Sequence, residues 1–523
     1  MKKVLFLSLM LVSMAMAAQN TSGYRNPVIP GYHPDPSVCR VGDDYYLVNS
    51  SFQYFPGVPI YHSRDLIHWQ QIGNVLGRQS QVPLGQATSW LGIYAPTIRY
   101  NDGVYYMITT NVGNGGNFYV TATNPAGPWS EPIWVKQQGI DPSLFFENGK
   151  CYMVSNPNDA IWLCEIDPKT GEQLTESRML WQGTGGRYPE GPHLYKKDGY
   201  YYLLISEGGT EYGHSITIAR SKKIEGPYES NPDNPILCHQ RRITQSSQIQ
   251  GTGHADLVQA ADGSWWMVFL AFRTYGGNYH HLGRETFLAP VEWKKGKWPV
   301  VNGNGTVDTL MNVTTLPQRN MRPTNGRVDF SSAKLGPEWV FIQNPLMQNY
   351  AFTNGILRLN ASASSLEEND HPTFVGRRQE SPRMSVETVV DVAGMAKWAE
   401  AGLTVYQIND GLYKLFARRA EVDGRTVTQI VQGYKVKGLE SENVIYTTPL
   451  TKVCLRVDAD ENAYYFTAGD ERLDDYVKGK PLDTIMLSSE VAGGFTGVIL
   501  GIYAAASNNL GYADFQYFDY KEK

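Results

Sequence analysis

Residues 35–48, "DPSVCRVGDDYYLV", contain the pattern that decides the fold. The tight turn "GDD" is followed at once by an aromatic pair and an apolar run, which is typical of a β-hairpin. The same unit of turn, aromatic-containing pair and apolar run recurs four times along the chain. The copies are "DGVYYMI" at Tyr105-Tyr106, "NGKCYMV" at Cys151-Tyr152, "DGYYYLL" at Tyr201-Tyr202 and "DGSWWMV" at Trp265-Trp266. The sequence therefore predicts five equivalent hairpins.

Further strand-like runs, such as "PIYHS" and "FYVTAT", follow each hairpin. Each unit then holds about four short strands, and the units repeat roughly every 46 to 64 residues. Four-stranded units arranged around an axis are the blades of a β-propeller. A β-sandwich with similar hairpins is the alternative, but five units in the same order favour a five-bladed propeller.

The strand that enters each hairpin also has a repeated beginning. The five segments read "DPSV", "APTI", "DPSL", "EGPHL" and "HADL", and they begin at Asp35, Ala95, Asp141, Glu190 and His254. In a propeller the innermost strand of every blade starts beside the central axis. We therefore expect Asp35, Asp141 and Glu190 to converge in one axial pocket, with His254 beside them.

Three carboxylates in one confined pocket repel one another and lose hydration, so at least one pKa must rise. A protonated carboxyl can act as an acid while an ionised one acts as a base or nucleophile, which is the chemistry of glycoside hydrolysis. Two other interpretations stay open. Each Asp-Pro-Ser could be a self-capped turn, and the carboxylates with His254 could hold calcium or a softer metal.

The segments "HPDPSVCRVGDDYY", "GIDPSLF", "EGPHLY", "GHADLV" and "LGRETF" resemble glycoside hydrolase family 43, a group of five-bladed furanosidases and xylosidases. The resemblance covers residues 26–304. It implies that Asp35 is the general base that activates water, that Glu190 is the general acid, and that Asp141 tunes the pKa of Glu190 and orients it. It also implies inversion at the anomeric carbon.

The resemblance further implies a set of substrate-binding residues. Arg284 would reach hydroxyls of the terminal sugar, Phe52 would form an aromatic wall, and His254 would face the axis, in some members near a cation through water. Xylosidase-like members place Trp and Phe where this chain has Tyr94 and Ile140. The pocket for the terminal sugar is therefore altered, and we expect arabinofuranose to be preferred over xylose.

We thus expect an exo-acting enzyme that removes terminal α-L-arabinofuranosyl units from plant cell-wall glycans, with xyloglucan or arabinoxylan side chains as sources. A β-xylosidase on the same machinery is the alternative, an endo-arabinanase or a retaining fructosidase-like enzyme is less favoured, and a non-catalytic carbohydrate-binding propeller is the alternative from another class. No cofactor is required, although a structural calcium near the axis is left open. The partner is an oligosaccharide or polysaccharide, and the oligomeric state is not indicated.

The last third of the chain reads as a second domain. Residues 305–325 continue a stretch rich in Asn, Gly, Thr and Pro and are expected to be a linker after a propeller at residues 24–304. Beyond it, at residues 326–523, short runs such as "AGLTVYQI" alternate apolar and polar residues, which predicts a β-sandwich of jelly-roll or lectin-like type. We expect it to pack against the propeller and close one side of the pocket.

The first 17 residues have the order of a secretory signal: Lys2-Lys3, an apolar run through Met14, then Ala15-Met16-Ala17. The protein is therefore expected to be exported, to the periplasm or the outside, with no membrane association after cleavage. The net charge of −5 and the absence of a basic run argue against a nucleic-acid partner.

Five cysteines are present, so at least one thiol is unpaired within the chain. Cys151 and Cys164 flank the turn "NPND" and could face each other across a hairpin, but buried thiols are the favoured interpretation. The chain lacks a zinc, nucleotide-binding or Gly-x-Ser-x-Gly signature.

Overall fold

A computed structural model describes residues 23–240, 248–312, 315–317, 326–508 and 511–523. The expected signal segment, residues 1–17, and most of the later part of the expected linker lie outside these residues. The described residues form strands and two short 3-10 turns, η1 (Met347–Asn349) and η2 (Thr484–Leu487). Among them no helix is long and apolar enough to cross a membrane.

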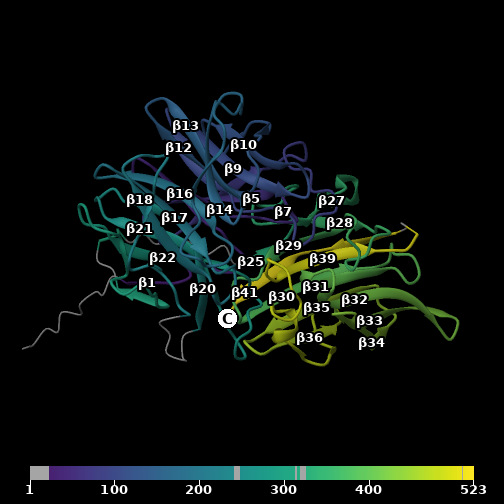
Figure 1. The fold of residues 1–523 in the computed structure, drawn as a ribbon. Helices are drawn as coiled ribbons and strands as arrows, with labels where there is room; N and C mark the ends of the chain where they lie inside the picture. The colour runs from purple at the N-terminus through teal and green to yellow at the C-terminus, as the bar shows by residue number, and fades with distance from the viewer. Residues whose placement is uncertain (1–22, 241–247, 313–314, 318–325, 509–510) are drawn as a thin grey trace, which may run out of the picture.

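The first part of the chain forms five β-sheets, one for each predicted hairpin (Figure 1, purple to teal). In each sheet the strands are given from the innermost outward. The first sheet holds β2 (Ser37–Val41), β3 (Asp44–Val48), β5 (Gly57–Ser63) and β6 (Gln70–Leu76), and the second holds β8 (Thr97–Asn101), β9 (Val104–Val112), β10 (Gly116–Ala122) and β11 (Ile133–Trp134), with β7 (Gly92–Ile93) also paired to β9. The third sheet holds β12 (Ile140–Glu147), β13 (Lys150–Asn158), β14 (Ala160–Ile166) and β15 (Arg178–Trp181), the fourth holds β16 (Glu190–Lys197), β17 (Tyr200–Glu207), β18 (Ser215–Ser221) and β19 (Glu229–Ser230), and the fifth holds β20 (Ile249–Gln259), β21 (Trp265–Arg273), β22 (Glu285–Glu292) and β23 (Val300–Val301).

The first strands of the five sheets contact one another in a closed ring. Strand β2 contacts β8, β8 contacts β12, β12 contacts β16, β16 contacts β20, and β20 returns to β2. These strands therefore surround the axis, and the prediction of a five-bladed propeller is confirmed.

The aromatic pairs fill the spaces between blades. Side chains alternate between the two faces of a strand, so one member of each pair is buried and the other is half-buried; Tyr105 is buried, for example, and Tyr106 is half-buried. Tyr105 packs edge-on against Tyr46 of the preceding blade, and Tyr106 packs against Phe146 of the following blade. The pairs that predict the hairpins thus also join neighbouring blades.

A short strand pair lies beside the fifth blade. Strand β1 (Gly23–Arg25) pairs with β24 (Leu310–Asn312), and the side chain of Asn26 hydrogen bonds to Leu288 in β22. Residues 310–312, inside the segment expected to be a linker, are therefore a strand that holds the N-terminal part of the described chain.

The second domain is a sandwich of two antiparallel sheets, as predicted (Figure 1, green to yellow). One sheet holds β25 (Gly326–Val328), β27 (Tyr350–Thr353), β28 (Ile356–Asn360), β30 (Met384–Asp391), β35 (Lys452–Ala459), β36 (Ala463–Gly469), β37 (Tyr476–Lys478), β38 (Leu482–Asp483), β40 (Tyr512–Phe515) and β41 (Phe518–Glu522). The other holds β29 (Phe374–Arg378), β31 (Glu400–Ile408), β32 (Gly411–Val422), β33 (Arg425–Val436), β34 (Leu439–Thr448) and β39 (Ile499–Ala505).

The two domains share a hydrophobic core. Strand β4 (Tyr54–Phe55) of the propeller pairs with β26 (Phe341–Ile342) of the second domain. Tyr54 packs in one cluster with Ile342 and with Phe374 of the sandwich. The second domain is therefore fixed against the propeller.

All five cysteines are free and buried, as the favoured interpretation expected. In the β13–β14 pair Cys151 lies opposite Ile166 and Cys164 lies opposite Met153, so the two thiols are not cross-strand partners.

Candidate active site

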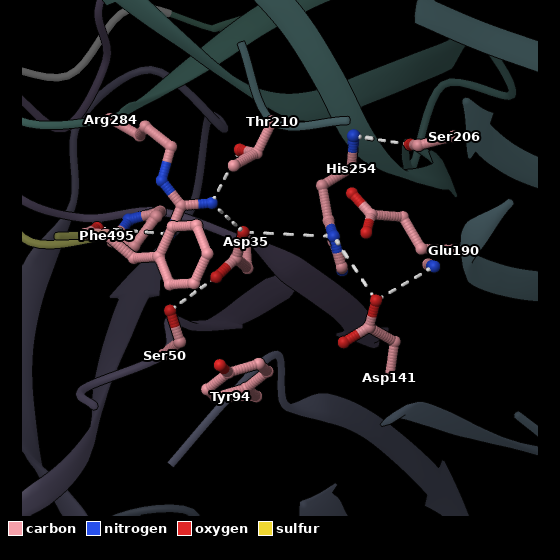
Figure 2. A network of polar contacts seen from close by, with 12 residues as sticks. Asp35, Ser50, Tyr94, Asp141, Glu190, Ser206, Thr210, His254, Arg284 and Phe495 are labelled. Atoms are coloured by element: carbon pink, nitrogen blue, oxygen red, sulfur yellow. Dashed lines mark hydrogen bonds and ion pairs between the residues drawn. The ribbon is translucent and has the colours of Figure 1, made fainter. Parts of the chain in front are cut away.

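The residues singled out from the sequence line one cavity. It has a volume of about 60 Å³ and lies beside the beginnings of the innermost strands. Its walls include all eight predicted site residues, which are Asp35, Phe52, Tyr94, Ile140, Asp141, Glu190, His254 and Arg284. Figure 2 shows Asp35, Asp141, Glu190 and His254 pointing toward one another. The predicted convergence of residues from separate blades is thus observed.

An unusual backbone conformation aims these side chains at the axis. Asp35, Asp141 and His254 have φ angles of 52°, 53° and 47°, in the left-handed region that few non-glycine residues adopt. In the fourth blade the corresponding position is Gly191, with φ 58°, and the carboxylate comes from Glu190 immediately before it. Backbone strain of this kind is concentrated at functional sites.

Asp35 has partners that favour its ionised form. Ser50 Oγ donates a hydrogen bond of 2.6 Å to Oδ2, and Arg284 Nη1 donates one of 3.0 Å to Oδ1. Burial alone would raise the pKa of Asp35, but Arg284, His254 and Ser50 together bring it below its usual value. Asp35 is therefore charged at neutral pH and can accept a proton.

Asp141 has the same local sequence but the opposite protonation tendency. Burial raises its pKa well above the usual value, and the negative charges of Glu190 and Asp35 raise it further. The raised pKa expected from converging carboxylates thus appears at Asp141. The negative charge of Glu190 is thus one reason why the protonated form of Asp141 is favoured.

Two contacts place Glu190 beside Asp141. The backbone N–H of Gly191 donates to Asp141 Oδ2 at 3.1 Å, and Asn156 of the third blade donates its side-chain N–H to the carbonyl of Pro189. The residues before and after Glu190 are therefore both tied to blade three, which keeps the two carboxyl groups together.

His254 lies near both aspartates. Its Nδ1 is 3.8 Å from Asp35 and 4.0 Å from Asp141, and its backbone N–H donates to Ser206 Oγ at 2.6 Å. Burial lowers its pKa, which keeps the ring neutral. In the part of the chain that the structure describes, no group of three His, Cys, Asp or Glu side chains is arranged to hold a metal ion.

Arg284 binds three groups of the protein. It donates to Asp35, to Thr210 Oγ1 at 2.9 Å and to the carbonyl of Phe495 at 3.2 Å, and it lines the cavity in which a contact with sugar hydroxyls was predicted. The Phe52 and Phe495 rings each lie 5.6 Å from its guanidinium carbon, and their centroids are 5.7 Å apart. Arg284 therefore holds Asp35 in its charged form and forms part of the wall.

Several residues of the site were not predicted. Ser50 and Thr210 bind Asp35 and Arg284. Ser50 comes four residues after Tyr46, and Thr110, Asn156 and Ser206 follow the second residue of three other pairs at the same offset, so this repeat is a signal that could have found Ser50. Phe495 comes from the second domain and packs against Phe52 and Trp90, with ring centroids 5.7 and 4.8 Å apart. No local pattern in the sequence connects a residue so far along the chain with this cavity.

A larger cavity adjoins the first. It has a volume of about 370 Å³ and shares Thr210, Arg284 and Phe495 with the inner cavity. Its remaining walls come from both domains and include Trp90, Glu211, Tyr212, Phe272, His280, Ser489, Glu490 and Gly494. A volume above about 300 Å³ is typical of small-molecule sites.

A carboxylate with a lowered pKa and two further carboxyl groups, one of which has a raised pKa, lie in one cavity, and this arrangement defines the class of acid–base glycoside hydrolases. Residues 24–299 match the sequence profile of "Glycosyl hydrolases family 43", and residues 327–521 match that of "Beta xylosidase C-terminal Concanavalin A-like domain". The chain belongs to glycoside hydrolase family 43.

Similar proteins cover the whole chain. A non-reducing end α-L-arabinofuranosidase of Bacteroides ovatus is 43% identical over 100% of this chain and 99% of its own. A xylosidase/arabinosidase of Butyrivibrio fibrisolvens is 38% identical over 95% and 99%. Among solved structures, "Bacteroides ovatus Xyloglucan PUL GH43B" has a TM-score of 0.90 at 41% identity over 96% of this chain and 100% of its own. A xylan β-1,4-xylosidase of Bacillus halodurans has a TM-score of 0.89 at 32% identity over 95% and 100%.

Proposed function

We propose that this protein is an inverting exo-glycosidase that removes non-reducing-end α-L-arabinofuranosyl residues from plant cell-wall glycans. The observation that carries the proposal is that Asp35, with a lowered pKa, shares one cavity with Glu190 and with Asp141, whose pKa is raised. The 43% identity to an arabinofuranosidase over the full length supports the choice of sugar.

In the proposed reaction Asp35 removes a proton from a water molecule as its oxygen attacks the anomeric carbon. Glu190 gives its proton to the glycosidic oxygen as the bond from that oxygen to the anomeric carbon breaks. Asp141 accepts the hydrogen bond of the Gly191 N–H and so holds Glu190 in place. The products are arabinose of inverted configuration and the shortened glycan, and exchange with solvent restores both carboxyl groups.

The inner cavity is the proposed place of the terminal sugar, and the outer cavity is the proposed place of the glycan that leaves. The inner cavity is small and is walled by Phe495 from the second domain, which suits an enzyme acting at a chain end. The outer cavity has aromatic and carboxylate side chains, which suit the faces and hydroxyls of sugar rings. Xyloglucan side chains are the proposed source, with arabinoxylan as the alternative.

β-Xylosidase activity is the second candidate function. It is favoured by relatives named xylosidases, including a β-xylosidase of Bacillus subtilis at 32% identity over 95% of this chain. Tyr94 and Ile140 both line the inner cavity, so they are placed to decide between the two sugars.

Export is also part of the proposal and is supported by the charged, apolar and small-residue order of residues 1–17. The carboxyl groups account for the chemistry without a metal, so no cofactor is proposed for catalysis.

The proposal is tested by incubating the protein in parallel with p-nitrophenyl α-L-arabinofuranoside and p-nitrophenyl β-D-xylopyranoside. We expect faster release from the arabinofuranoside, and NMR of the first product should show inverted configuration. Faster release of nitrophenol from the xylopyranoside would show that xylose, and not arabinose, is the preferred sugar. A first product with retained configuration would overturn the proposed mechanism. Binding of arabino-oligosaccharides without release of a monosaccharide would indicate a non-catalytic propeller.

A further inference from the structure

A buried histidine that the mechanism above does not use lies against the proposed acid. His214 immediately precedes β18, and its side chain is fully buried. Its Nε2 lies 3.2 Å from Oε1 of Glu190, whose side chain is 17% exposed. Among the described residues this imidazole therefore has a carboxyl oxygen of the active site within hydrogen-bonding distance.

Among the described residues, the Glu190 carboxyl group is the one ion-pair partner of the imidazole. Within the described segments neither Nδ1 nor Nε2 of His214 makes an aligned hydrogen bond. A buried polar group without a hydrogen bond costs about 1–3 kcal/mol, and such groups are uncommon in native proteins. Hydrogen bonds of catalytic groups are often poorly aligned before substrate binds and tighten in the complex. A small rotation of the Glu190 carboxyl group would align this pair.

The neighbouring backbone is built to admit the imidazole. A Cβ atom added to Gly253 would lie 2.0 Å from ring atoms of His214, so only glycine fits there. The backbone N–H of His214 donates to the carbonyl of Glu211 at 3.0 Å. A side chain at Gly208 would lie 2.1 Å from the carbonyl of Gly213. Close packing thus fixes the ring against Glu190.

We propose that His214 is a positioning residue for the general acid. Its Nε2–H donates to Oε1 of Glu190, which limits rotation of the carboxyl group and leaves the other oxygen to serve the leaving group. When Glu190 has given its proton to the glycosidic oxygen, the same N–H stabilises the carboxylate that remains. This inference rests on the proposed acid role of Glu190.

The effect of His214 is specific to the acid because of its surroundings. The charged or titratable groups that it faces are Glu190 at 3.2 Å and, farther away, Asp35 and His254. Asp35 already has Arg284 and Ser50 as direct partners. Removal of the imidazole should therefore affect protonation of the leaving group much more than activation of water.

The first experiment compares His214→Ala with His214→Gln, whose amide N–H can reach the position of Nε2. With an arabino-oligosaccharide, whose leaving group needs protonation, we expect His214→Ala to lower kcat by about 10- to 100-fold, a share of the 10²–10⁴-fold effect of general acid catalysis. With an aryl glycoside of low leaving-group pKa the loss should be less than about 3-fold. His214→Gln should recover most of the loss. Equal losses on both substrates would overturn the proposal, and if His214→Ala does not fold, the same comparison is made with His214→Gln and His214→Asn.

The second experiment is a double-mutant cycle with Glu190→Gln. If His214 acts through Glu190, the double variant should be no slower than Glu190→Gln alone, because the two residues work as one unit. If the double variant loses activity by the product of the two single losses, His214 has a structural role that is separate from Glu190. If Glu190→Gln itself shows no dependence on the leaving group, the proposed acid assignment fails instead.

The matched control is His281→Ala. His281 is also a buried histidine whose Nε2 has no hydrogen-bond partner among the described residues, but it packs near Tyr275 and Tyr464. This control variant shows how much activity is lost when a buried imidazole away from Glu190 is removed. We expect kcat to change by less than 2-fold on both substrates, and a loss that matches His214→Ala would contradict the positioning role.

Discussion

At the scale of single residues, Asp35 and Asp141 differ in protonation although both belong to an Asp-Pro-Ser with the same backbone conformation. Asp35 lies beside the Arg284 guanidinium, which offsets the cost of its burial. Asp141 lies beside another carboxyl group, which adds to that cost. The repeated Asp-Pro-Ser thus determines where each carboxyl group lies, and the groups around each aspartate determine whether it is ionised.

Substitution of the proposed acid and base should have different effects on different substrates. Glu190→Gln should lower kcat/KM on oligosaccharides by about 10²–10⁴-fold and by less on activated aryl glycosides, which need little protonation. Asp35→Asn should lose activity on both, since water activation is common to them. Steady-state kinetics on the two substrates measure this, with exposed Asp43→Asn as the control. Retained activity in Asp35→Asn would remove it as the base.

Asp141→Asn should lower activity but raise stability at neutral pH. The folded pKa of Asp141 is raised, so its contribution to stability is complete below the unfolded pKa of about 3.9 and is lost as pH rises toward the folded value. Because Asn does not ionise, the Tm of Asp141→Asn relative to that of the wild type should rise from pH 3.5 to pH 7.

The substitution Asp35→Asn should change stability at neutral pH in the opposite direction. The folded pKa of Asp35 is lowered, so its contribution is present above the unfolded pKa and is lost as pH falls. Its Tm should therefore be below that of the wild type at pH 7. Calorimetry of both variants at several pH values tests the two predictions. A difference in Tm between Asp141→Asn and the wild type that does not depend on pH would contradict the raised pKa of Asp141.

At the scale of elements, a polar network joins the innermost strands beneath the active site. Asp256 of β20 accepts hydrogen bonds from Ser37, Arg99 and Tyr195, which come from blades one, two and four. Arg99 also contacts His193 of β16. Burial would raise the pKa of Asp256, but Arg99 and its other partners hold it well below its usual range.

Asp256→Asn should destabilise the protein by about 3–5 kcal/mol, because it leaves the largely buried Arg99 without a counter-charge. Chemical denaturation at pH 7 measures the change. The control is Glu229→Gln, which breaks the more exposed pair between Arg220 and Glu229 and should cost at most about 1 kcal/mol. Equal effects of the two variants would mean that the buried network does not stabilise the propeller.

The repeated elements also explain what could be predicted from the sequence. Turn residues and aromatic pairs act locally, so the five hairpins and the three carboxylates at their entrances followed from spacing alone. Ser50 belongs to a weaker polar repeat, four residues after the second residue of the hairpin pair. Thr210 and His214 lie in the loop between β17 and β18, where a lone histidine before a strand has no distinguishing signal. Phe495 reaches the site only because two domains pack together, which no local pattern encodes.

At the scale of the whole molecule, the second domain completes the active site. The Phe495 carbonyl accepts a hydrogen bond from Arg284, and Glu490 pairs with His280 of the propeller at 2.6 Å. Both residues also line the outer cavity. The interface between domains and the proposed substrate site are therefore continuous.

Phe495→Ala should lower kcat/KM by at least about 10-fold, mainly through KM, because the ring closes the cavity against Phe52 and Trp90. The loss in Tm should be small because the ring is only partly buried. Tyr476→Ala, an exposed aromatic on β37 of the sandwich, is the control and should leave both unchanged. An unchanged KM in Phe495→Ala would show that the second domain does not contact substrate.

The hydrogen bond from Arg284 to the main chain of residue 495 also bears on chimaeric enzymes. Grafting a foreign C-terminal module onto this propeller would replace the carbonyl that accepts from Arg284, the arginine that keeps Asp35, the proposed base, charged. Catalytic power and sugar preference would then change together, so the two modules are best inherited, or engineered, as a matched set.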